Sequence, residues 1–201
     1  MSRSALAFRG YNVANLGKTP ELLAVPAYAD IIEEELRRYS EVCRDVIGRP
    51  VDLVRHVREG VEPDLSRYAE AIALVVAVEF AQLRLLREIH EIEPLQAKLA
   101  FGYSLGEMSA LCACGDFQPE RLIEAPLAMA SDCAELARDV RMGVVFSRGV
   151  SVSEEAAERL CQQITAEGRG VVGISAVLTP NTLLLVGQGD SVARFKAARR
   201  G

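Results

Sequence analysis

Apolar residues along this chain form short continuous runs and longer stretches with helical spacing. The runs at residues 5–8 and 97–101 are short and end at turn-forming residues, which predicts two buried strands. Between them, residues 66–89 are apolar nearly all round over their first half, so they predict a buried helix. A further helix is predicted over residues 108–114. The second strand therefore leads, through a short turn, into a helix.

Other helices are predicted in the same half of the chain. Residues 19–21, Thr-Pro-Glu, form a good helix start, with a hydroxyl N-cap, a proline at the first helical position and an acid in the first turn. A longer helix is expected through the acid-rich segment 31–36. Residues 117–137 are also predicted to be helical, with a break or kink near Pro126. The segment 51–57 is too short to assign.

The pattern changes after residue 140. Strands and helices are predicted there in the order β-α-β-β-α, over residues 143–146, 153–166, 170–177, 182–186 and 190–199. This order is that of a ferredoxin-like split unit without its final strand. We therefore expect a main core over residues 1–140 and a partial ferredoxin-like subdomain over residues 141–201.

Composition narrows the class of protein. Half of the 201 residues are apolar and a quarter are charged, which is enough for a folded core, and the net charge of −5 makes a nucleic-acid partner unexpected. No secretory signal is visible, and the longest apolar run, 71–78, is too short to cross a membrane. The five cysteines are odd in number and lack a disulfide-framework spacing, which favours a reducing compartment. We expect a cytoplasmic protein with no membrane partner.

A metal site is not expected. Cys112 and Cys114 are close in sequence, but on a helix their side chains point about 200° apart. No second cysteine or histidine pair accompanies them. These two thiols are therefore predicted to be buried and to pack as small apolar groups.

The strongest chemical signal is a Gly-x-Ser-x-Gly pentapeptide formed by Gly102, Ser104 and Gly106. It lies between a predicted strand and a predicted helix, which is the setting of a nucleophile elbow. There the serine occupies a turn so sharp that both flanking positions favour glycine. The N–H of Leu105, at the start of the helix, could stabilise an oxyanion. The alternative is a tight turn with a purely structural role.

The segment around this serine resembles a known family. Residues 102–111, Gly-Tyr-Ser-Leu-Gly-Glu-Met-Ser-Ala-Leu, resemble the Gly-His-Ser-Leu-Gly-Glu-Tyr-Ser-Ala-Leu signature of malonyl-CoA:acyl-carrier-protein transacylases and polyketide-synthase acyltransferase domains. Residues 7–10 and 16–18 are similar to the family's N-terminal loop, and residues 71–86 to the apolar helix before its elbow. The resemblance implies an α/β fold: an α/β-hydrolase-like acyltransferase core with a partial ferredoxin-like subdomain.

The resemblance also implies an activity. The family moves an acyl group from a coenzyme A or carrier thioester to an acyl carrier protein, through an acyl-serine intermediate, in fatty-acid or polyketide biosynthesis. By this likeness Ser104 is the nucleophile, and the backbone N–H groups of Leu105 and Tyr11 form the oxyanion hole. The implied partners are acyl-CoA and an acyl carrier protein. No bound cofactor is implied, because the acyl-CoA or phosphopantetheinyl thioester is the substrate.

Two departures from the family bear on the acyl group. Tyr103 stands where the family usually has histidine, and Leu127 stands where an arginine normally pairs with the malonyl carboxylate. An unpaired buried carboxylate would cost several kcal/mol. Tyr103, Leu127 and Met129 are therefore expected to line a pocket for an uncharged acyl chain.

A third departure concerns the catalytic base. In the family the catalytic histidine lies beyond the ferredoxin-like insert, whereas His56 and His90 both precede Ser104 and are expected at the surface or as caps. We favour the view that these residues are the N-terminal part of a longer acyltransferase, because a split unit leaves a sheet edge unpaired. The alternatives are a non-catalytic protein that binds carriers as a scaffold, and an acyl hydrolase.

Overall fold

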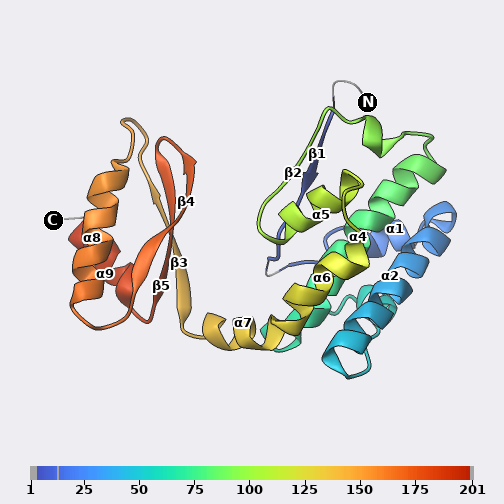
Figure 1. Ribbon diagram of the computed structural model, residues 1–201, viewed down its shortest axis with the longest axis horizontal. Helices are drawn as coiled ribbons and strands as arrows, with labels where there is room; N and C mark the ends of the chain where they lie inside the picture. Colours follow the sequence, from blue (N-terminus) through green and yellow to red (C-terminus); the bar gives the residue numbers. More distant parts are fainter. Residues whose placement is uncertain (1–3, 13, 200–201) are drawn as a thin grey trace. The chain divides into compact units, whose positions relative to one another are not determined.

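The computed structural model describes residues 4–12 and 14–199. The chain forms two compact units, Met1–Ala134 and Glu135–Gly201 (Figure 1). Helix α7, Ala130–Ala137, crosses the boundary between them. Each unit is described separately below.

The first unit contains a parallel pair of strands. Strand β1, Ala5–Phe8, pairs with β2, Leu99–Gly102, with Phe8 opposite Gly102. Both predicted strands are confirmed, although the second begins two residues later than expected. Parallel neighbours need a long crossover, and here it consists of helices. Because the two strands run in the same direction, the loop after β1 and the turn after β2 lie at the same end of the pair.

Helices make up most of this unit. They are α1 Thr19–Leu23, α2 Pro26–Ile47, α3 Leu53–Glu59, α4 Tyr68–Glu88, α5 Leu105–Ala113 and α6 Pro119–Ala128, with 3-10 turns at Leu65–Arg67 and Pro94–Gln96. Helix α4 is buried over most of its length, as its apolar sequence predicted, and packs along α2. The long acid-bearing helix is also confirmed as α2. Its buried face includes Leu36, Tyr39 and Cys43, while charged residues cover its outer face.

Several details of the helices differ from the sequence-based expectations. Thr19 is not an N-cap but the first residue of α1, and no side chain caps that helix. The unassigned segment becomes α3 because Asp52 caps it, accepting the N–H of Arg55 at 2.9 Å. The expected break near Pro126 falls at Met129, since Pro126 lies inside α6.

The second unit has the predicted β-α-β-β-α order. Its elements are β3 Val140–Phe146, α8 Glu154–Ala166, β4 Val172–Thr179, β5 Thr182–Gln188 and α9 Ser191–Ala198. The sheet order is β3-β5-β4, and β5 is antiparallel to both neighbours. Strands β3 and β4 are consequently parallel to each other with β5 between them, which is the split arrangement of a ferredoxin-like fold.

One face of this sheet is covered and the other is open. The core between sheet and helices contains Leu183 and Leu185 of β5 and Phe195 of α9, each about 1% exposed. On β3, Met142 and Phe146 are more than half exposed. The alternation along the strands therefore places one apolar set against the helices and leaves a second set uncovered.

Candidate active site

The turn at Ser104 has the backbone of an elbow. Strand β2 ends at Gly102 and α5 begins at Leu105, so only two residues connect them. Ser104 has φ 57° and ψ −121°, a conformation that costs a non-glycine residue roughly 1–3 kcal/mol. Among the described residues, only Ser104 and Glu91 combine a side chain with positive φ. A strained serine at a strand-to-helix turn matches the geometry that the pentapeptide predicts.

Both glycines of the pentapeptide are required by close backbone contacts. A Cβ on Gly102 would lie 2.0 Å from the carbonyl oxygen of Gly106. A Cβ on Gly106 would lie 2.3 Å from the carbonyl oxygen of Phe8. No real side chain fits at such distances. The start of α5 is therefore packed directly on the end of β1, and the two glycines make that approach possible.

The loop after β1 lies against the serine. A Cβ on Gly10 would be 2.7 Å from the carbonyl oxygen of Tyr103 and 3.3 Å from Cβ of Ser104. Tyr11 follows Gly10, and its ring meets that of Tyr68 edge-on, with centroids 4.7 Å apart. Burial, followed by the charges of nearby acids, raises the pKa of the Tyr11 hydroxyl. The structure thus brings the backbone of the β1 loop beside Ser104, 94 residues later in the chain.

Hydrogen bonds fix this loop on its outer side. The Arg9 guanidinium donates to the carbonyl oxygen of Ala14 at 2.7 Å. The Glu62 carboxylate accepts the N–H groups of Asn15 and Leu16 at 2.8 and 2.9 Å. These bonds tie Arg9 to the backbone at Ala14 and the N–H groups of Asn15 and Leu16 to Glu62.

No family model and no curated protein matches this chain in sequence, whereas solved structures match its fold. The malonyl-CoA:acyl carrier protein transacylase of Xanthomonas oryzae pv. oryzae aligns with a TM-score of 0.70 and 22% identity, over 100% of this chain and 60% of that one. A protein of Streptococcus pneumoniae named MCAT aligns with a TM-score of 0.70 and 25% identity, over 98% of this chain and 59% of that one.

A third solved structure is a complex. In it, a type II polyketide-synthase acyl-carrier protein is bound to its malonyl-transacylase. The alignment has a TM-score of 0.68 and 23% identity, over 98% of this chain and 59% of that one. This chain has the fold of the malonyl-CoA:acyl carrier protein transacylases. It spans about three fifths of the length of these structures. The expected fold class is confirmed.

The first unit contains a buried acid that the sequence patterns do not single out. Glu79 of α4 is 7% exposed, and its Oε1 accepts the N–H of Arg9 at 2.8 Å. Its Oε2 and the hydroxyl of Ser109 on α5 are both buried, and the two side chains lie close enough to interact. Burial raises the pKa of Glu79 to about 7, although Ser109 and the Arg9 N–H favour the charged form. The available signal was an acid inside an otherwise apolar helix.

The three residues expected at an acyl pocket are placed differently from one another. Leu127 is 1% exposed and belongs to the same core cluster as Leu105, the residue after the serine. Tyr103 and Met129 are 53% and 58% exposed. The leucine at the family's arginine position is therefore a core residue of this fold, and the other two are at the surface of the first unit.

The two histidines are engaged away from the serine. His56 is 8% exposed, so the expectation of a surface or capping histidine is wrong for it. Its ring packs between α3 and α4, where Glu70 and the carbonyl of Val61 bind its two nitrogens. His90 is exposed, as expected, and lies 3.0 Å from the Tyr28 hydroxyl. Neither histidine hydrogen-bonds to Ser104.

The cysteines, possible metal-binding clusters and possible membrane spans complete the description of this part of the chain. All five cysteines are free thiols; Cys112 is buried, but Cys114 is exposed, so the expectation that both are buried is wrong for the second. Cys114 is the C-cap of α5, so it lies where the helix ends and its side chain is exposed. In residues 4–12 and 14–199 no cluster of three metal-binding side chains occurs. None of the helices described there has the length and apolar character needed to span a membrane.

Proposed function

We propose that this chain is the serine-bearing part of an acyltransferase. In the first step the Ser104 hydroxyl attacks the carbonyl of an acyl-CoA or carrier thioester. The C–S bond breaks, the thiol leaves with a proton, and an acyl-Ser104 ester forms. In the second step the phosphopantetheine thiol of an acyl carrier protein attacks the ester and releases the serine. The strained backbone of Ser104 is the observation that carries this proposal.

The backbone around Ser104 supports the charge that would develop in both steps. As the first residue of α5, Leu105 has an N–H without an intrahelical acceptor, at the positive end of the helix. The N–H of Tyr11 is the second donor in the proposal, because Gly10 packs against Ser104. Two preorganised donors would stabilise a tetrahedral oxyanion, and each is typically worth about 3 kcal/mol.

The proposal also needs a base for the serine proton. Serine is a weak nucleophile until a neighbouring group removes that proton. Both histidines are committed to other partners. The base would therefore come from a group outside these 201 residues, which span about three fifths of the matched transacylases.

For the acyl group we propose an uncharged chain. Leu127 offers no positive charge, and it lies in the core cluster that contains Leu105. A malonyl carboxylate placed there would lose its hydration without gaining a cation, at a cost of several kcal/mol. An acetyl or longer alkyl group carries no charge and would not bear that cost. An acyl carrier protein is the proposed acceptor, in line with the titled complex among the matched structures.

Intact-protein mass spectrometry tests these proposals directly. A chain extended to include the base is incubated with acetyl-CoA or malonyl-CoA, alongside its Ser104→Ala variant as the matched control. An acetyl adduct that is absent from the variant, and that a carrier thiol removes faster than water does, supports transfer. Rapid loss to water indicates an acyl hydrolase. Preferential malonyl labelling would overturn the uncharged-acyl proposal, and absence of any adduct in a chain extended to include a base would indicate a scaffold.

A further inference from the structure

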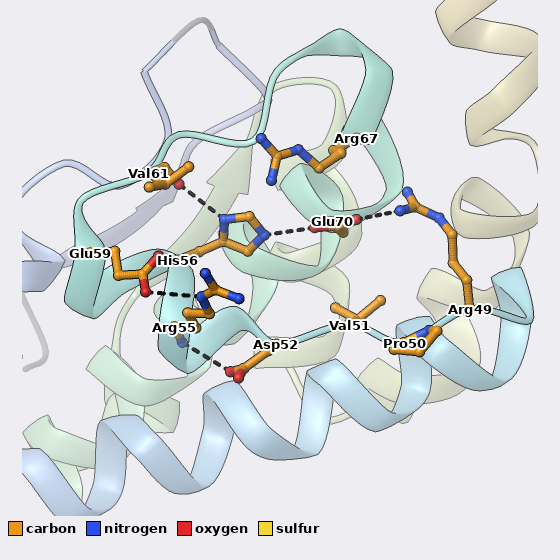
Figure 2. A pocket seen from close by; sticks show the side chains of 10 residues that line it. All are labelled: Arg49, Pro50, Val51, Asp52, Arg55, His56, Glu59, Val61, Arg67 and Glu70. Carbon is orange, nitrogen blue, oxygen red and sulfur yellow. Dashed lines mark hydrogen bonds and ion pairs between the residues drawn. The ribbon is translucent and has the colours of Figure 1, made fainter.

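A cleft in the first unit is lined by residues other than those of the serine turn. It has a volume of about 570 Å³ and lies between the end of α2, helix α3 and the start of α4. Its charged lining consists of Arg49, Asp52, Arg55, His56, Glu59, Arg67 and Glu70 (Figure 2). Pro50, Val51 and Val61 provide apolar wall. This volume lies within the range of small-molecule pockets, roughly 300–1,000 Å³.

The acid at the floor of the cleft, Glu70, has a partner on each oxygen. Nε2 of His56 is 2.6 Å from Oε2 of Glu70, and Nδ1 of the same ring is 3.1 Å from the carbonyl oxygen of Val61. Arg49 reaches the other oxygen of Glu70 at 2.8 Å. Glu70 is therefore paired without Arg55 or Arg67.

The other acids of the cleft are also engaged. Arg55 and Glu59 pair at 2.9 Å, and Asp52 caps α3 through the N–H of Arg55. Arg49 pairs with Glu70. Among the described residues the Arg67 guanidinium forms no ion pair and no hydrogen bond, so it is the cation of the cleft that is left for a ligand.

One acid near Arg67 lies outside the cleft. The pKa of Asp64 is lowered, mainly by the hydroxyl hydrogen bond from Ser66 and to a smaller extent by the charge of Arg67. Its Oδ1 accepts both the N–H and the hydroxyl of Ser66. Asp64 is therefore occupied with capping the 3-10 turn and forms no ion pair with Arg67.

Donors for an anion remain on two sides of the cleft. Arg67 has its whole guanidinium, and Arg55 uses only Nε towards Glu59, which leaves its terminal amino groups (Figure 2). One guanidinium group binds two oxygens of a phosphate at once. Two guanidinium groups from different elements can both do so on a phosphate, whereas a carboxylate has oxygens for only one of them. We propose that this cleft binds a small organic phosphate monoester, with Arg67 as the principal anchor and Arg55 as the second. The apolar wall would contact the organic part.

Isothermal titration calorimetry of the 201-residue chain at low ionic strength tests this site. The titrants are inorganic phosphate, ribose 5-phosphate and unphosphorylated ribose. Arg67→Gln should weaken ribose 5-phosphate binding about tenfold or more, because a bidentate charged contact is lost. Arg121→Gln removes the same charge from an exposed arginine on α6 and should change affinity less than about twofold. Glu59→Gln should strengthen binding, since it frees Arg55 completely.

The outcomes separate the parts of the proposal. Tighter binding of ribose 5-phosphate than of phosphate, together with sensitivity to Arg67→Gln but not to Arg121→Gln, supports it. Equal affinity for inorganic phosphate and ribose 5-phosphate would mean that the cleft binds the free anion, and would overturn the proposal that it recognises an organic phosphate. Absence of saturable binding, or equal effects of the two glutamine variants, would overturn the site. If Arg67→Gln fails to fold, Arg67→Lys keeps the charge but loses the fork, and should still weaken binding.

Discussion

Replacing Glu79 by glutamine should make the protein more stable above neutral pH. The carboxyl group is buried, and burial raises its pKa from 4.5 to about 7. Between these values the folded state holds a proton that the unfolded state has released, so stability falls as pH rises through this window. A pKa difference of this size corresponds to about 3 kcal/mol at 1.36 kcal/mol per unit. The wild-type chain bears that cost fully above pH 7.

Glutamine would avoid the cost and keep the useful contact. Its carbonyl oxygen can still accept the N–H of Arg9, now 2.8 Å from Oε1 of Glu79. Its amide can also donate to the buried hydroxyl of Ser109, which lies beside the Glu79 carboxyl group. We therefore expect Glu79→Gln to stabilise the first unit by up to about 3 kcal/mol at pH 8, with the gain shrinking towards pH 4.5.

Urea denaturation at several pH values between 5 and 8 measures this gain. The chain has no tryptophan, so far-UV circular dichroism is the suitable signal. Glu41→Gln, which removes an exposed acid from α2, is the matched control and should show no such gain. A Glu79→Gln gain that stays constant from pH 5 to 8, or that reverses sign as pH rises, would refute the reasoning from burial.

Three further variants test other contacts by chemical denaturation. Gly106→Ala should destabilise by at least 1–3 kcal/mol, because its Cβ would lie 2.3 Å from a carbonyl oxygen, whereas Gly149→Ala meets nothing within 4 Å and should be near neutral. Ser104→Gly should stabilise by about 1 kcal/mol, since glycine tolerates φ 57°; a loss of stability would contradict backbone strain. His56→Ala should cost about 3 kcal/mol by leaving Glu70 with one partner fewer; a neutral effect would show the pair to be unimportant.

Features set by local sequence could be predicted. The pentapeptide lies between an apolar run and a helical pattern, and the structure shows a strained turn there with both flanking glycines in close backbone contact. The element order of the second unit was likewise readable, because apolar runs alternate there with an amphipathic helix that opens at a Ser153 N-cap. Such signals depend on residues within a few positions of one another.

Contacts between distant residues could not be predicted from one sequence. Glu79 accepts from Arg9, 70 residues earlier, and His56 meets Glu70, 14 residues later. Glu79 is a lone acid in an apolar stretch and His56 lies among charged residues, and neither pattern identifies the partner. The same limit applies to Leu127: its apolar character predicts burial, but only the packing of α6 places it in the core cluster with Leu105.

Two costs to stability meet at the same turn, and this bears on what the turn is for. Ser104 adopts a backbone conformation that glycine would adopt without strain. Glu79 accepts the N–H of Arg9, in the loop that packs against Ser104, with a buried acid where a neutral amide could make the same bond. A turn with a purely structural role would be served better by glycine and glutamine. Strain and costly polar burial are retained where function requires them, so their coincidence supports the acyl-serine proposal over a structural turn.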